Sequence, residues 1–347
     1  MIVAKAPAKL IITGEHAVVH GRSAIVTAID RFASTTLTPM EGGTIRIELP
    51  GLGETEDFTR ERLASLRRTL TERYRAFREG RIGVEKILDR PIDRFAYGVA
   101  LFLEGYAPDT DRGFLLRIDT DFPGGSGLGS SAATVASMIV ALSHAFGHPL
   151  PIEARDRLVF ETEKLCHGTP SGVDPYIVVH GGCVVYHRGG CKPLPPPTIP
   201  FRLIHTGRPT VTTGVTVARV TEAFPPVDPI WNEFEAVAVA MERLFLSERP
   251  QEAEMIDLVR RNHRLLVQIG VVPQRVRALI EAIEAEGGAA KICGAGAVEG
   301  EQAGIVLTIT DHPLEDYCEG TPFSPLIVHG EPEGARLAES NGTPRTS

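Results

Sequence analysis

Two spacings of hydrophobic residues alternate along the chain. Mostly apolar stretches at 2–12, 23–37, 44–49 and 113–119 are predicted to be strands, the first of them an edge or leading strand because Pro7 interrupts it. Residues 59–80 instead carry leucines and a tyrosine at every third or fourth position, which is typical of an amphipathic helix. Helices are also predicted over 91–105, 134–147 and 152–166. The first half of the chain is therefore expected to mix strands and helices.

The second half begins with a stretch that is predicted to form a strand, a turn and a second strand, residues 176–187. Residues 193–200 then hold five prolines and are predicted to be a linker. A strand at 201–207, helices from about 212 to 285 and a strand at 304–310 follow. This order predicts two domains, 1–192 and 201–330, and a polar tail at 331–347.

Composition narrows the class of protein. The 347 residues include 36 lysines and arginines against 44 aspartates and glutamates, a formal net charge of −8. This acidic balance, without a basic block, argues against a nucleic-acid partner. No stretch reaches the roughly 18 apolar residues of a membrane span, and the first residues do not resemble a secretory signal. Five cysteines, with no C-x-x-C pair, predict neither a disulfide framework nor a zinc–cysteine site and fit a reducing cytoplasm.

The strongest chemical signal is a glycine- and serine-rich loop between a predicted strand and an apolar helix, residues 123–133 (PGGSGLGSSAA). Glycines let a backbone approach a ligand closely, and a helix N-terminus offers unpaired N–H groups with a partial positive charge. This combination predicts a phosphate cradle; the alternative is a tight turn capped by Ser130 or Ser131. The loop matches neither the Walker P-loop nor the G-x-G-x-x-G dinucleotide motif.

Two further groups carry residues that suit phosphoryl transfer. Glu163 ends a predicted helix and Asp174 follows a Pro/Gly turn, so the two carboxylates could divide metal binding from catalysis. Asp174 alone would more often be a turn former. A third group consists of Lys9 on the first strand and the pair Glu15-His16 at a turn. These residues could bring a cation and hydrogen-bonding groups to one cleft; the alternative is that they are solvated on the surface.

Taken together and in this order, these motifs resemble the GHMP kinases, and within them most the mevalonate kinase branch. The matching segments are 6–9 with 14–21, the loop 123–133, 163–174 and 262–271, and the resemblance extends over about residues 1–330. It implies an α+β fold, with an N-terminal ribosomal-S5-like α/β domain, a C-terminal ferredoxin-like domain and the active site in the cleft between them. It also implies ATP-dependent phosphorylation of the primary alcohol of mevalonate to 5-phosphomevalonate, for isoprenoid biosynthesis through the mevalonate pathway. Mg²⁺ would accompany ATP, and a homodimer is compatible with the resemblance.

The resemblance implies a role for each matching residue. Asp174 would be the catalytic carboxylate, with Lys9 beside it to stabilise the attacking oxygen. Mg²⁺ would be held by Ser131 and Glu163. The mevalonate pocket would be lined by Glu15, His16 and Thr213, the last of which matches only after a gap. The ATP phosphates would lie on Gly125, Ser126, Gly127, Leu128, Gly129, Ser130 and Ser131.

Two departures from the family pattern keep other activities open. Ala8 replaces a usual glycine, and 294–300 read GAGAVEG where the family has more glycines, so Glu299 adds an anion where phosphates would lie. A kinase of another small alcohol or of a phosphorylated alcohol such as phosphomevalonate remains an alternative, as does a non-catalytic nucleotide-binding relative. The four residues that together argue against the non-catalytic relative, because a pure binder has no need of a general base, are Lys9, Ser131, Glu163 and Asp174.

Overall fold

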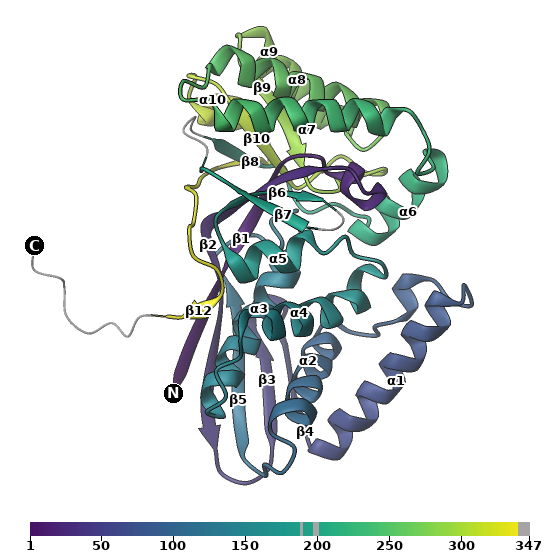
Figure 1. The fold of residues 1–347 in the computed structure, drawn as a ribbon, viewed down its shortest axis with the longest axis vertical. Coiled ribbons are helices and arrows are strands. Elements are labelled where there is room, and N and C mark those ends of the chain that lie inside the picture. The colour runs from purple at the N-terminus through teal and green to yellow at the C-terminus, as the bar shows by residue number, and fades with distance from the viewer. Residues whose placement is uncertain (188–189, 197–200, 339–347) are drawn as a thin grey trace, which may run out of the picture.

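The computed structural model describes residues 1–187, 190–196 and 201–338, and their strands form two sheets (Figure 1). The first sheet consists of β1 (Ile2–Thr13), β2 (Ala24–Met40), β3 (Ile45–Leu49), β4 (Glu54–Phe58), β5 (Gly113–Thr120), β6 (Cys183–His187), β7 (Gly190–Leu194) and β12 (Arg336–Leu337). The second consists of β8 (Arg202–His205), β9 (Ala289–Cys293), β10 (Ile305–Ile309) and β11 (Ser324–Ile327).

Helices connect these strands and cover both sheets. The α-helices are α1 (Arg60–Arg78), α2 (Pro91–Tyr106), α3 (Ser130–Ala145), α4 (Ile152–His167), α5 (Val173–His180), α6 (Thr213–Ala223), α7 (Ile230–Leu246), α8 (Glu252–Gln268), α9 (Gln274–Ala285) and α10 (Leu314–Cys318). Three 3₁₀ helices are η1 (His16–His20), η2 (Pro50–Leu52) and η3 (Val84–Lys86).

The first sheet has the order β12-β1-β2-β5-β3-β4, and only the β3–β5 pair is parallel. The long strand β2 pairs with β1 along one edge and with two strands along the other edge. On that second edge, residues 24–27 pair with β6 and residues 33–40 pair with β5. Pro7 lies where the register between β1 and β2 shifts, a place at which a residue without an N–H is tolerated. The second sheet is antiparallel in the order β11-β8-β10-β9.

Helix packing brings the two sheets together. Helix α3 lies on β1 and β2, and α4 and α5 pack around it; α8 and α9 cover the second sheet, and α7 packs on α8 (Figure 1). Helix α7 also reaches the first sheet, and the buried Trp231 packs against His20 of η1 with ring centroids 4.2 Å apart and the rings tilted by 32°. A single continuous hydrophobic cluster runs through both halves. The segment after β1 is therefore fixed between the two sheets.

Most of the predicted elements are confirmed to within a few residues, but the prediction for 176–187 is wrong in its first part. Residues 173–180 form helix α5, and only β6 is a strand. Gly172, at φ +93°, provides the left-handed turn that starts the helix, and Val178 and Val179 are buried in helical form against α3 and α4. Tertiary packing thus overrides the strand preference of the β-branched residues.

The division at residues 192 and 201 stays a prediction, because both sheets share one core. Residues 197–200 of the predicted linker and 339–347 of the predicted tail lie outside the described residues. The first part of that tail is built into the first sheet: β12 pairs with Ala4 and Lys5 of β1, and Ala335 donates its N–H to the carbonyl of Val178 at 2.9 Å. None of the helices in the described part of the chain combines the length and the apolar character that crossing a membrane requires.

Candidate active site

A cavity of about 180 Å³ lies where the two halves meet, and most of the predicted site residues line it. Its walls come from β1, η1, the glycine-rich loop, the end of α4, the start of α5, the first turn of α6 and the loop after β9. The predicted residues that line it are Lys9, Glu15, His16, Gly125, Gly127, Gly129, Ser130, Ser131, Glu163, Asp174 and Thr213. Of the predicted loop residues, Ser126 and Leu128 are not among the lining residues and are buried.

In the glycine-rich loop, glycines that line the cavity alternate with residues that are buried in the protein. Gly125, Gly127 and Gly129 all have positive φ angles, whereas Ser126 donates its hydroxyl to the carbonyl of Pro123 at 2.6 Å. The carbonyl of Leu128 accepts the backbone N–H of Lys9 at 3.0 Å, which ties the loop to β1. A β-carbon on Gly129 would come within 2.7 Å of the Lys9 side chain. Glycine is therefore required here both for the backbone angle and for room beside the lysine.

Lys9 and Asp174 form an ion pair that opens into the cavity. The Lys9 ammonium lies 3.2 Å from Oδ1 of Asp174, which is in the first turn of α5. The Lys9 side chain is 3% exposed and that of Asp174 is 31% exposed, so the carboxylate can be reached by a ligand. A carboxylate in this position can accept a proton from an alcohol, and the ammonium can stabilise the oxygen left behind.

Ser131, Glu163 and His167 form a second polar chain along the same wall. The Ser131 hydroxyl donates to Oε1 of Glu163 at 2.6 Å, and Nε2 of His167 lies 3.3 Å from the other carboxylate oxygen. Burial acts to raise the pKa of Glu163, but the hydrogen bond and charge of His167, then Arg94 and Ser131, outweigh it and hold that pKa below its usual value. Glu163 is therefore a buried anion beside the glycine-rich loop.

These oxygen donors fit Mg²⁺. Magnesium prefers oxygen ligands and usually binds through one or two carboxylates together with water and substrate phosphates. Within the described residues, no group of three or more histidine, cysteine or acidic side chains is arranged to hold a metal ion. A metal held by Ser131 and Glu163 would thus depend on the phosphates of a nucleotide for its remaining ligands.

Glu15 lines the cavity, but its carboxylate is held in a buried network. It pairs with the ammonium of Lys291 on β9 and accepts a hydrogen bond from Asn262 at 3.1 Å, and both lysine and glutamate side chains are fully buried. Burial acts to lower the pKa of Lys291, but its neighbours Cys293 and Glu15 outweigh that effect and raise it. No local pattern signals this pairing, because Glu15 and Lys291 are far apart along the chain.

His16 is fixed as a neutral ring at the cavity wall. Its Nε2 lies 2.9 Å from the carbonyl oxygen of Ala295, and because a carbonyl can only accept, Nε2 carries the proton. Burial is the main cause that lowers the pKa of His16. Thr213, the first residue of α6, lines the same cavity. The structure thus brings His16 and Thr213 to one cavity, and their role in binding the acceptor stays a prediction.

The loop after β9 keeps its unusual anion out of the cavity. Glu299 forms an ion pair with Arg219 of α6, and neither residue is among those that line the cavity. Both side chains are about half exposed, at 57% and 49%. The departure from the family pattern thus lies beside the site rather than in it.

Sequence reasoning missed Arg94, whose guanidinium donates to the Ser131 hydroxyl at 2.8 Å. Arg94 belongs to α2, which is far from the loop in sequence. The signal that the sequence offers is the isolation of Arg94, which is the sole cation in the mostly apolar run of residues 92–103.

Comparisons with known proteins agree with this geometry. The family model for the GHMP kinases N terminal domain matches residues 94–182, which include the glycine-rich loop, Glu163 and Asp174. The mevalonate kinase of Thermococcus sibiricus is 31% identical over 306 residues, 85% of this chain and 86% of that protein. The mevalonate kinase of Thermococcus onnurineus is 31% identical over 356 residues, 97% of this chain and 98% of that protein.

The chain belongs to the GHMP kinase family. The solved structure of the Methanococcus jannaschii mevalonate kinase shares its fold, with a TM-score of 0.76 at 18% identity over 94% of this chain and 98% of that one. The predicted α+β GHMP kinase fold is confirmed. As a GHMP kinase, the protein is a small-molecule phosphotransferase.

Proposed function

We propose that this GHMP kinase transfers the γ-phosphoryl group of ATP to the primary alcohol of mevalonate and forms 5-phosphomevalonate in the mevalonate pathway. The observation that carries the proposal is the Lys9–Asp174 pair, which lines the same cavity as the glycine-rich loop. The choice of mevalonate is supported by relatives named mevalonate kinase that align with nearly the whole chain.

The chain's own groups would act by position and charge. Backbone N–H groups of the glycine-rich loop and the start of α3 would bind the ATP phosphates. Asp174 would orient the alcohol and accept its proton, while Lys9 would stabilise the attacking oxygen. His16 and Thr213 would hold the acceptor, with Glu15 behind His16 as a support rather than a direct contact. Little covalent work is left to the protein in a loose phosphoryl transfer.

Ser131 and Glu163 would hold Mg²⁺ when it enters with the nucleotide. The ion would neutralise phosphate charge that the loop alone cannot neutralise. We further propose a cytoplasmic location, to which the five free cysteines are suited, and a homodimer, which the family resemblance allows.

The test is ADP release by the purified protein with Mg-ATP and one acceptor at a time: mevalonate, phosphomevalonate, homoserine, galactose or none. Turnover with mevalonate alone is expected. Turnover with another acceptor would leave the kinase mechanism in place and replace the substrate. Binding of ATP without turnover on any acceptor would favour the non-catalytic relative and contradict the proposal.

A further inference from the structure

Arg94 stands directly behind the proposed metal ligands, although the mechanism above does not use it. Its Nη1 donates to the Ser131 hydroxyl at 2.8 Å and lies 3.9 Å from the Cys166 sulfur, and its guanidinium packs 4.5 Å from the centre of the Phe95 ring. Arg94 does not line the cavity. It therefore acts on a bound ligand through Ser131 rather than by touching the ligand.

The two hydrogen bonds that the Ser131 hydroxyl already makes limit how it can bind a further ligand. A serine hydroxyl has one proton to donate and two lone pairs to accept with. The ionised Glu163 carboxylate can only accept, so it takes the proton at 2.6 Å, and the guanidinium can only donate, so it takes one lone pair. One lone pair of Ser131 remains, and Ser131 lines the cavity. That lone pair suits a cation and cannot donate to a phosphate oxygen.

We infer that Arg94 is a positioning residue that fixes the Ser131 hydroxyl as an acceptor toward the cavity and so makes Ser131 a ligand for the magnesium of a magnesium–nucleotide complex. The inference rests on the proposed metal site. Without Arg94, the hydroxyl could rotate and donate to a phosphate instead. Groups that orient metal ligands from behind commonly change metal affinity about 10- to 100-fold when they are removed.

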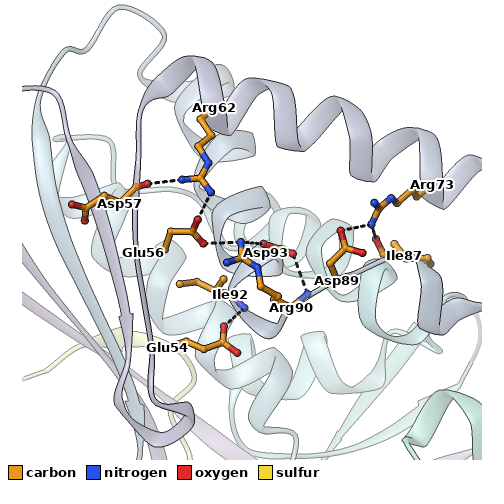
Figure 2. A network of polar contacts seen from close by, with 10 residues as sticks. All are labelled: Glu54, Glu56, Asp57, Arg62, Arg73, Ile87, Asp89, Arg90, Ile92 and Asp93. Atoms are coloured by element: carbon orange, nitrogen blue, oxygen red, sulfur yellow. Dashed lines mark hydrogen bonds and ion pairs between the residues drawn. The ribbon is translucent and has the colours of Figure 1, made fainter.

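The start of α2 holds Arg94 in place and also supplies a matched control. Figure 2 shows Arg90, one turn earlier, bonded to Glu56 and Asp93, and the backbone N–H of Ile92 bonded to Glu54. The Arg90 guanidinium lies 2.6 Å from Glu56 and 2.9 Å from Asp93. Arg90, the residue that caps the start of α2, is thus an arginine that stabilises the helix and does not reach the site.

The experiment is a double-mutant cycle read by calorimetric ADP binding, with magnesium and again with EDTA. The proteins are the wild type, Arg94→Met, Ser131→Ala, the double variant and Arg90→Met. Arg94→Met is expected to reduce the magnesium-dependent gain in ADP affinity about tenfold while leaving affinity in EDTA within about twofold. The double variant should match Ser131→Ala, because both changes remove the same ligand.

Arg90→Met should lower the thermal unfolding temperature and leave the magnesium-dependent gain unchanged. Arg94→Lys, which can still donate one hydrogen bond, should restore part of the gain. Three results would each overturn the inference: additive effects in the cycle, an equal loss of affinity in EDTA, or no loss in Arg94→Met. Since no acceptor is present, failure here is separate from failure of mevalonate as the substrate, which the turnover panel reports.

Discussion

Two of the lysine–carboxylate pairs in the described part of the chain, Lys9–Asp174 and Lys291–Glu15, differ in what surrounds them. Lys9 and Asp174 are 3.2 Å apart, and Asp174 is about one-third exposed to the cavity. Glu15 and Lys291 are both fully buried, and Asn262 completes their hydrogen bonding. A pair that a ligand can reach is available for chemistry, whereas a closed pair can only hold its elements together. The residue types are nearly the same, so accessibility separates the two roles.

The largest effect is expected at the open pair. Asp174→Ala should lower kcat about 10³- to 10⁴-fold, because it removes the group that accepts the alcohol proton. ATP affinity, measured by titration, should stay within about twofold, since the phosphates bind the loop and not Asp174. If the variant kept most of its turnover, Asp174 would have no part in catalysis, and the open and closed pairs would no longer differ in role.

At the closed pair, the expected loss is in stability. Lys291→Met leaves the Glu15 carboxylate buried without its cation, which typically costs about 3–5 kcal/mol of unfolding free energy. Denaturant-induced unfolding measures this loss of unfolding free energy. The double change Lys291→Met with Glu15→Gln should recover part of that loss.

The exposed pair of Arg219 and Glu299 serves as the control for the closed pair. Arg219→Met should change the unfolding free energy by no more than about 1 kcal/mol. Equal losses at the exposed and the buried pair would mean that burial does not determine what these ion pairs contribute.

Lys9→Met makes at the open pair the same substitution that Lys291→Met makes at the closed pair, so the two variants give the most direct comparison of the pairs. We expect kcat to fall about 10²-fold through loss of charge beside the attacking oxygen. The unfolding free energy should change by about 1 kcal/mol or less, since Asp174 can be hydrated from the cavity. A large stability loss with unchanged kcat would assign Lys9 the role given to Lys291.

The smallest effect concerns a buried histidine near Lys291. Burial, with a smaller contribution from nearby cations, lowers the pKa of His263 from 6.5 to about 4. The unfolded chain therefore takes up a proton first as pH falls below about 6.5, so stability decreases between pH 6.5 and 4. Replacing this ring by His263→Gln should reduce the stability difference between pH 7 and pH 5 by about 1–2 kcal/mol. An unchanged pH dependence in urea unfolding would contradict this.

Local patterns predicted the elements that carry their own signals. The glycine-rich loop and its helix were readable because backbone angles and helix termini demand particular residues. Helix α5 was misread, because its valines prefer strands and only its packing on α3 and α4 makes it helical.

Most of the residues that the family resemblance assigns to the site line one cavity, but the resemblance could not give the direction of a side chain. Glu15 turns to Lys291, and Arg94 reaches Ser131 from another helix. Both contacts join segments that are distant along the chain, so no local pattern contains them.

The pairing of β12 with β1 has a consequence for synthesis. The partners that β1 has on one edge, at Ala4 and Lys5, are residues 336 and 337, which are synthesised more than 300 residues after β1. Until they emerge, that edge of a nascent first sheet stays unpaired and open to other strands. A truncation before residue 331 removes β12 and would leave this edge of β1 permanently open to other strands.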